Sequence, residues 1–261
     1  MKLTTLYNQD NILALRAEDI EASYINTLRR YMSSRVPTIA IDFVEFKDNS
    51  GILYDEMVAH RMGMIPLTTD SETYRLPQEQ WDEPTGNPRE EVELTLSVSA
   101  GKQEVVVKAK DFKSKDAKIQ PVHPEMPITK LIKGQAIECV AYARMGTGEE
   151  HAKWSPGHIW YRAYPHITIE KQPKNPQEVA DKYPGVFEVK KDKLSVAKDA
   201  AYHYPDTEMD VEEISVEFND NDYILIIESW GQLEPMTILK QAVTAYNDQL
   251  DEFNDLLEEL N

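Results

Sequence analysis

The feature that most constrains this chain is a long stripe of apolar residues near its C-terminal end. From Pro235 to about residue 260, apolar residues recur at intervals of three and four, in a near-heptad order. The pattern predicts a helix of about 25 residues, roughly 37 Å long. Its apolar positions are Leu239, Ala242, Tyr246, Leu250, Phe253, Leu257 and Leu260.

A second amphipathic segment near the N-terminus could cover part of this stripe. Its apolar residues, spaced by three and four, predict a helix over residues 20–34, with Asp19 as its cap and Val36-Pro37 as its end. This helix is shorter than the C-terminal one. Burial stabilises by about 25 cal/mol per Å2, so uncovered Leu and Phe side chains would favour association with another chain. The alternative is that the stripe packs entirely on the chain's own sheet.

Most of the remaining sequence alternates between apolar and polar residues, which is typical of antiparallel strands. We predict a hairpin over residues 3–18 and a short helix from Asp55 to Gly63. Residues 70–91 read as a loop or mobile segment, and 171–215 as a further break with strand-like pieces at 186–189 and 193–196. A second hairpin is predicted at 214–218 and 223–229, turning at Asn219–Asp222. The other strands are expected at 38–46, 92–99, 104–108, 135–144 and 158–170. The fold class is α+β.

The charge and the cysteine content exclude several classes of protein. The formal net charge is −18, so unassisted nucleic-acid binding, which depends on Lys and Arg, is not expected. Such acidity can keep a protein in solution or complement basic partners, and both readings stay open. Cys139 is the one cysteine and lies in an apolar strand, which suggests a buried, inert thiol. Without a signal peptide or a long apolar run, we expect a soluble, cytoplasmic protein and no membrane contact.

The sequence contains no motif that predicts catalysis, a metal or a cofactor. A phosphate loop, a zinc-protease motif and a nucleophile elbow are all missing, and the histidines show no metal-ligand spacing. Asp220 and Asp222 fit a turn better than a calcium loop. The segment 146–157 carries Trp154 among turn residues, and this tryptophan could anchor an interface or fill a small core.

Several motifs, taken together and in order, resemble the α-like subunits of DNA-directed RNA polymerase. They are NTLRR at 26–30, VPTIAID at 36–42, DE at 55–56 and AHRMGMIPL at 59–67. HAKWSP at 151–156 resembles the archaeal D subunit and its eukaryotic third-largest-subunit relatives more than bacterial α. ESWGQL at 228–233 resembles the family's entry into the last helix.

The resemblance implies a domain plan and a set of partners. An α-like dimerisation domain, an antiparallel sheet plus two helices, would be built from residues 1–46 and 216–261, with a mostly β insert domain at 47–169. The two helices would face the small L subunit in a heterodimer. That platform would then receive the N and P subunits and the second-largest and largest catalytic subunits. The chain itself would be a non-catalytic assembly subunit.

The resemblance also nominates interface residues. Asn26, Arg29 and Arg30 match a motif that faces the second-largest subunit in the family, and arginine suits bidentate binding of carboxylates or carbonyls. Arg61 could serve an interface or simply pair with Asp55 or Glu56 to fix its helix. The predicted subunit-interface set is Asn26, Leu28, Arg29, Arg30, Asp55, Glu56, His60, Arg61, His151, Lys153 and Trp154. The predicted dimerisation helix uses Leu239, Ala242, Tyr246, Leu250, Phe253 and Leu257.

One region departs from the family pattern. Many archaeal D subunits carry a ferredoxin-like domain with cysteine-bound iron–sulfur clusters where residues 170–215 stand here. A cluster needs about four thiolates, and this region has no cysteine. We therefore expect a degenerate ferredoxin-like subdomain that holds no cluster.

Two other functions stay open on the residues alone. The chain could be a standalone homodimeric binding protein, with no link to a polymerase. It could also be a hydrolase or transferase that uses the loop at 146–158, in which case turnover would depend on His151 or Lys153.

Overall fold

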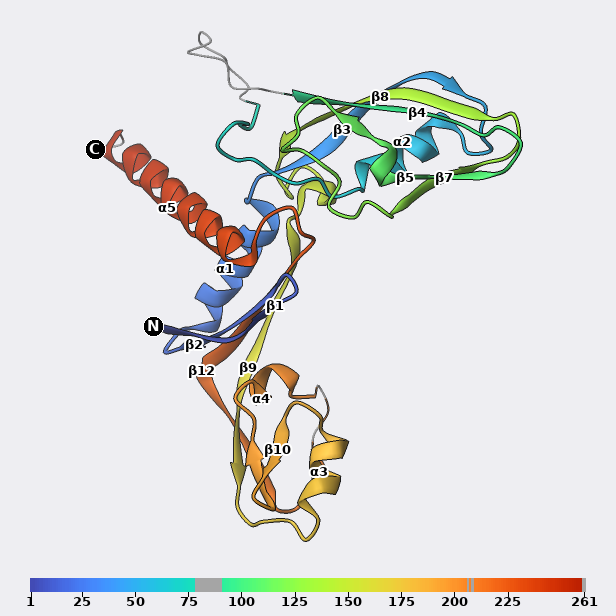
Figure 1. Cartoon of the computed structure of the whole chain (residues 1–261). Coiled ribbons are helices and arrows are strands. Elements are labelled where there is room, and N and C mark those ends of the chain that lie inside the picture. Colours follow the sequence, from blue (N-terminus) through green and yellow to red (C-terminus); the bar gives the residue numbers. More distant parts are fainter. Residues whose placement is uncertain (78–90, 206, 208, 260–261) are drawn as a thin grey trace. The chain divides into compact units, whose positions relative to one another are not determined.

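The computed structural model describes residues 1–77, 91–205, 207 and 209–259. The chain divides into two compact units. The first comprises residues 1–30 and 158–228, and the second residues 31–157 and 229–261. The α+β class is confirmed by antiparallel sheets combined with helices (Figure 1). The domain boundaries that the family resemblance implies, 1–46 with 216–261, 47–169 and 170–215, stay a prediction.

The first unit is built on a four-stranded sheet with the order β1-β2-β12-β9. Its strands are β1 (Lys2–Gln9), β2 (Ile12–Glu18), β12 (Ile214–Ser229) and β9 (Gly157–Ile169). The predicted N-terminal hairpin is confirmed: β1 pairs with β2, and Asp10 and Asn11 turn the chain with φ values of 51° and 63°. Positive φ at both central residues is the geometry of a two-residue hairpin turn, which Asp and Asn tolerate better than other residues.

The predicted hairpin at 214–229 is wrong, because β12 runs unbroken through Asn219–Asp222. The turn-forming residues are held extended by neighbouring strands. Asp222 is buried and accepts hydrogen bonds from Arg16 Nε and Nη2 of β2, the latter at 2.6 Å, while His166 Nε2 of β9 lies 2.9 Å from it. Asn219 Nδ2 also lies 3.1 Å from His166 Nε2. These cross-strand partners outweigh the local preference of the Asn and Asp residues for a turn.

The first helix, α1 (Ala22–Ser34), is confirmed, but its predicted cap is not. Asp19 lies before the helix with φ 58°, and the backbone carbonyl of Glu21 accepts the first hydrogen bonds, from the amides of Tyr24 and Ile25. Ile25 and Met32 are buried along the predicted apolar face.

Residues 170–213 form a small subdomain with α3 (Pro176–Lys182), β10 (Phe187–Lys190), β11 (Lys193–Val196) and α4 (Ala200–His203). The two strand-like pieces are confirmed as an antiparallel pair, whereas the two short helices were not predicted. Its core is apolar and includes Val186, Phe187, Leu194 and Ala200. Arg162 of β9 donates to the carbonyls of Ala201, Tyr202 and Tyr204, at 2.8–2.9 Å, and so fixes the end of α4.

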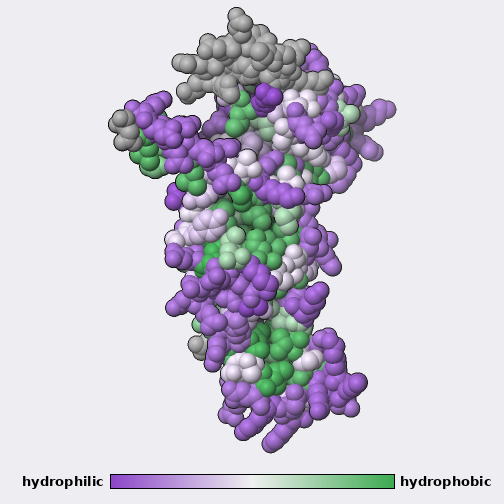
Figure 2. All heavy atoms as spheres, turned by 90° about the vertical axis from the view of Figure 1, so that its left-hand side faces the viewer, coloured by the Kyte–Doolittle hydropathy of each residue, from purple (hydrophilic) through white to green (hydrophobic). Residues whose placement is uncertain are grey.

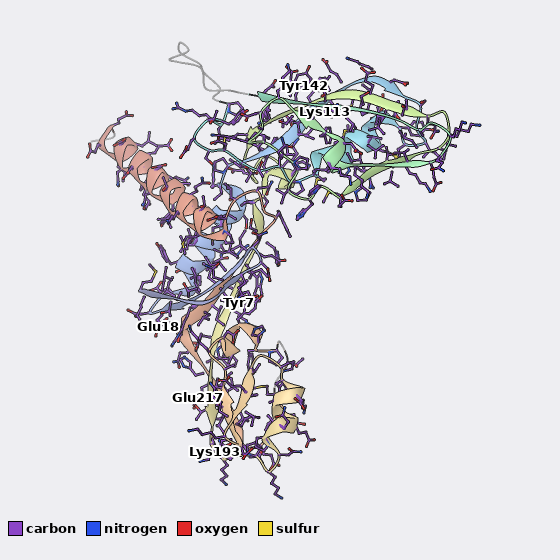
Figure 3. All side chains as sticks on the ribbon, in the orientation of Figure 1. Tyr7, Glu18, Lys113, Tyr142, Lys193 and Glu217 are labelled. Atoms are coloured by element: carbon purple, nitrogen blue, oxygen red, sulfur yellow. The ribbon has the colours of Figure 1, made fainter. Side chains whose placement is uncertain are left out.

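The second unit contains a sheet of order β3-β8-β4-β6 and a separate pair, β5 and β7. Helix α2 (Asp55–Gly63) lies between them (Figure 1) and buries Val58 and Met62 in the common core. Tyr142, labelled in Figure 3, stands between the core residues Ala141 and Ala143 and therefore faces away from that core. The strands are β3 (Thr38–Asn49), β4 (Glu91–Ser99), β5 (Val105–Lys108), β6 (Lys113–Ser114), β7 (Pro127–Leu131) and β8 (Ala136–Gly146).

The C-terminal helix is confirmed as α5 (Pro235–Glu259). The predicted loop at 70–91 lies mostly outside the described residues, which stop at 77 and resume at 91. Within the described residues, no helix combines the length and the apolarity needed to cross a membrane.

Candidate subunit interfaces

The apolar stripe of α5 is buried at its N-terminal end and exposed at its C-terminal end. Leu239 and Ala242 are buried, whereas Leu250 and Phe253 are 43% and 57% exposed. Leu256 and Leu257, one turn further on, are also exposed. Figure 2 shows hydrophobic surface beside hydrophilic surface on the C-terminal end of this helix.

The change from buried to exposed occurs near Tyr246. The ring of Tyr31, in the last turn of α1, meets the ring of Tyr246 edge to face, with centroids 5.1 Å apart. The Tyr31 hydroxyl also hydrogen-bonds the side chain of Gln249. Beyond this point the stripe is exposed, so the helix carries an apolar face that the described part of the chain leaves open to solvent.

The predicted residues of α1 divide between the core and the surface. Leu28 is buried, so within this chain it is a packing residue. Arg30 is exposed and Asn26 is partly buried. Arg29 Nε donates to Asn26 Oδ1 at 3.1 Å, which holds the guanidinium against the helix.

Arg61 of α2 binds main-chain carbonyls and not the carboxylates that the sequence offered. Its Nε donates to Ile128 O at 2.6 Å and its Nη2 to Pro127 O at 2.9 Å, both on β7. Asp55 instead accepts a hydrogen bond from Asn49 Nδ2, at 2.7 Å. Arg61 thus ties α2 to β7, while Glu56 and His60 stay exposed on the same helix.

Trp154 fills a small core, one of the two roles that the sequence left open. It is buried, and its Nε1 donates to Arg144 O at 3.2 Å. The Arg144 guanidinium and the Lys153 ammonium lie 4.4 Å and 4.2 Å from its ring centroid. A Cβ on Gly146 would stand 2.4 Å from the ring, so only glycine fits there.

Lys153 and Arg144 share one carboxylate, that of Asp42. Lys153 Nζ donates to Asp42 Oδ1 at 2.6 Å and Arg144 Nε to Asp42 Oδ2 at 2.7 Å. Burial alone would raise the pKa of Asp42, but these hydrogen bonds and charges outweigh it and the pKa is lowered. The ammonium end of Lys153 is therefore engaged by Asp42, which leaves a holding role for Lys153 as the contact that the geometry shows.

Two adjacent hollows lie on either side of Met64 and Lys153, with volumes of about 490 Å3 and about 300 Å3. Met64 follows α2, and Lys153 belongs to the loop that holds Trp154. The larger hollow is also lined by Pro66, His123, Met126, Ala152, Ser155, Gly157, Trp230 and Gln232. The smaller hollow is also lined by Ile41, Asp42, Phe43, Val44, Ala59, His60, Gly63 and His151.

The sequence predicted His60, His151 and Lys153 as interface residues, but it did not indicate that they lie around one hollow. It missed Met64 and Trp230, whose side chains are both about half exposed. The available signal was weak, since a single exposed methionine or tryptophan looks the same in a sequence as a buried one.

Two further features of the described residues concern the free thiol and the possible metal ligands. Burial, with a smaller effect of Asp55, raises the pKa of Cys139 to about 11, so the thiol stays protonated at neutral pH. Among the residues that the structure describes, His, Cys, Asp and Glu side chains form no group of three or more that could hold a metal ion.

Comparison with known proteins decides the family. Residues 41–159 match the model of the RNA polymerase Rpb3/RpoA insert domain. The DNA-directed RNA polymerase subunit Rpo3 of Pyrococcus furiosus is 32% identical to this chain, over 100% of the chain and 98% of the relative. The Rpo3 subunit of Methanosarcina acetivorans is also 32% identical, over 100% and 99%. The chain belongs to the Rpo3 family.

The match to Rpo3 extends over the subdomain as well as the insert domain. The Pyrobaculum calidifontis Rpo3 subunit, 34% identical, covers 92% of the chain. The matched residues 41–159 include α2, Trp154, all residues that line the smaller hollow, and those of the larger hollow except Trp230 and Gln232. The exposed end of α5 and the two hollows thus belong to a chain whose Rpo3 relatives are named as RNA polymerase subunits.

Proposed function

We propose that this chain is a non-catalytic assembly subunit of a DNA-directed RNA polymerase in the cytoplasm. Through α5 and α1 it pairs with a small α-like subunit, the L subunit of the archaeal enzyme. The pair then receives the N and P subunits and the two large catalytic subunits. Nucleotide addition takes place on those large chains, and this chain contributes by positioning them.

The observation that carries the proposal is the exposed end of α5 in a chain matched over its whole length by Rpo3 relatives. Leu250 and Phe253 lie on the same face as the buried Leu239 and Ala242, because they continue a spacing of three and four. Covering a Leu or Phe side chain stabilises by about 1.5–3 kcal/mol. Several such side chains on one helix supply enough energy for specific pairing.

The charge of the chain argues against self-pairing as the main use of this face. Two copies would bring together two molecules of net charge −18. The second half of α5 itself carries Asp248, Asp251, Glu252 and Asp255. Like charges oppose association unless a partner compensates them, which favours a different chain as the partner.

The test is a double substitution on the exposed end of α5, Leu250→Asp with Phe253→Asp. A matched control is Val106→Asp with Ile132→Asp, because these two side chains are 43% and 58% exposed on the insert domain. Both variants remove equally exposed apolar groups and add two charges. The affinity for the small α-like subunit is measured by isothermal titration calorimetry, with size measured by light scattering.

We expect the α5 variant to bind at least about 100-fold more weakly, because two buried apolar contacts are each worth more than about 1.4 kcal/mol. The control variant should bind like the unchanged chain, and circular dichroism should show both folded. Equal affinity of the two variants would show that α5 is not the interface. A stable homodimer that ignores the small subunit would instead support a standalone binding protein.

A further inference from the structure

We propose that the two hollows around Met64 and Lys153, here called the Met64 groove, bind an extended segment of another chain. That segment carries a large apolar side chain next to a carboxylate. The proposal rests on the proposed function, since it presumes that the chain works within an assembly. The groove is separate from the α5 face, and it therefore takes a different polypeptide segment.

The shape of the groove favours an extended segment. Its two hollows are adjacent and share Met64 and Lys153 as their common wall. In an extended strand, side chains i and i+2 point to the same side roughly 7 Å apart, so neighbouring hollows can take alternate side chains. Phe43, Met64 and Trp230 line the groove, and each is about half exposed.

The walls of the groove are held by fixed contacts. Lys153 Nζ is bound by Asp42 Oδ1 and by the carbonyl of Ile41, at 2.6 Å and 3.2 Å. The main chain at Trp230 is anchored by its amide, which donates to Pro156 O at 3.0 Å. Because these groups are already ordered, a ligand would lose little free energy in organising the site.

The charge of the groove differs from that of the molecule. The chain carries −18, yet among the described residues that line the two hollows Asp42 is the only one with a carboxylate. Both of its oxygens are occupied, one by Lys153 and the other by Arg144. A partner carboxylate would therefore meet no unpaired negative charge inside the groove.

The groove also offers hydrogen-bond donors. His151 Nδ1 accepts a hydrogen bond from the amide of Lys153, at 3.0 Å. A neutral imidazole that accepts at Nδ1 carries its proton on Nε2, so the exposed Nε2–H is a donor. His60 and His123 add two further exposed imidazoles to the lining. Donors beside apolar walls match a carboxylate beside a bulky apolar side chain, whereas a second copy of this acidic chain would be repelled.

Site-specific crosslinking in the assembled polymerase tests the occupant. A photoreactive phenylalanine analogue replaces Met64 in one preparation and Phe253 in another, and mass spectrometry identifies the linked peptides. We expect position 64 to link to a segment with a large apolar residue within two positions of Asp or Glu, distinct from the segment linked to position 253. A link from position 64 to a second copy of this chain, to a segment without a carboxylate, or to nothing would overturn the proposal. Loss of the link at position 253 alone would count against α5 pairing and not against the groove.

Substitutions, each with a matched control, measure independently how well the polymerase retains the chain that crosslinks to position 64. Met57 lies on α2, which Met64 directly follows. It is 53% exposed against 47% for Met64, and it does not line either hollow. Met64→Glu should weaken retention of the crosslinked chain at least about tenfold, as expected for losing one buried apolar contact. Met57→Glu should leave it unchanged, and both variants should keep the small α-like subunit.

Substitutions of two histidines test whether the bound segment carries a carboxylate. His151→Glu should weaken retention of the same chain about tenfold, since like charges in an interface repel. His151→Lys should preserve it. His158→Glu adds the same charge at another exposed histidine outside the hollows and should have no effect. If the His151→Glu and His158→Glu variants retain the partner chain equally well, the bound segment does not place a carboxylate beside His151.

Discussion

Gly148 is the position where the smallest change should have the largest effect on this chain. It lies in the Gly146-Thr147-Gly148 turn, against the last residues of α1. A Cβ built on it would stand 2.1 Å from the carbonyl oxygen of Ser33 and 3.1 Å from its carbonyl carbon. Both atoms are backbone, so they cannot move aside as a side chain could. We therefore expect Gly148→Ala to displace the turn from the end of α1.

The size of the effect follows from the contacts that hold the turn. The amide of Glu149 donates to Ser34 O at 3.1 Å, and the Glu149 carboxylate pairs with Arg35 at 2.6 Å. The ion pair is exposed and contributes little. Overpacking costs about 1–3 kcal/mol and a lost hydrogen bond about 0.5–1.5 kcal/mol, so the total is about 2–4 kcal/mol. In a chain of this size that lowers Tm by about 5–15 °C.

The assay is thermal unfolding, followed by circular dichroism, with Gly101→Ala as the matched control. A Cβ on Gly101 meets nothing within 4 Å. That variant should be neutral or slightly stabilised, because alanine restricts the unfolded chain. Amide exchange at the end of α1 should rise in Gly148→Ala only. If the Tm values of the two variants agree within about 2 °C, a shift worth less than about 1 kcal/mol, the turn does not anchor the helix.

Two further predictions concern other contacts. Arg162→Lys removes the planar guanidinium that binds three carbonyls around α4. We expect faster amide exchange over residues 176–204 and unchanged exchange in the β1–β2 hairpin. Unchanged exchange in both regions would refute a role for Arg162 in holding the subdomain. Hydrogen bonds from Lys118 and Thr73 lower the pKa of the Asp70 carboxyl to about 2. The ionised carboxylate therefore stabilises the folded chain above the usual aspartate pKa of about 4, and this stabilisation is lost as the pH falls toward 2. Asp70→Asn should therefore flatten the decline of unfolding free energy between these pH values, measured by urea titration at each pH, and an unchanged slope would contradict it.

Periodicity predicted most of the architecture because the corresponding elements bury one face in a regular way. The spacing of three and four in α5 and α1, and the alternation in β4 and β8, each reflect a helix or strand with one covered side. The N-terminal hairpin was predicted from apolar residues on both sides of the turn-forming segment 8–11, and in the structure Asp10 and Asn11 of that segment adopt the positive φ of the turn.

Two of the misses share a physical cause, namely that a partner distant in the sequence determined the local structure. Asn219–Asp222 reads as a turn, but Arg16 and His166, from other strands, hold it extended. Helix α4 spans only Ala200–His203, too short for a periodic signal, and depends on Arg162. Asp19 has the right chemistry for a cap, yet it adopts φ 58° before the helix begins.

The candidate interfaces were only partly predictable for a related reason. The sequence identified the residues of the α-like motifs but could not separate those that face inward from those that face out. Leu28 and Trp154 are buried, and Arg61 binds β7. The Met64 groove depends on segments near residues 43, 64, 153 and 230 coming together, which no local pattern encodes.

The α5 stripe is one periodic pattern that lies in two environments. Up to Ala242 it is part of the chain's own core, and from Leu250 onward it is exposed, with the Tyr31 contact to Tyr246 between the two regions. Because a helix is stiff over this length, the buried part fixes the direction in which the exposed part points. A partner that covers Leu250 and Phe253 therefore meets a surface that is already oriented before binding. Such preorganisation lowers the entropic cost of association, and it explains how a strip of few side chains can define a specific pairing geometry.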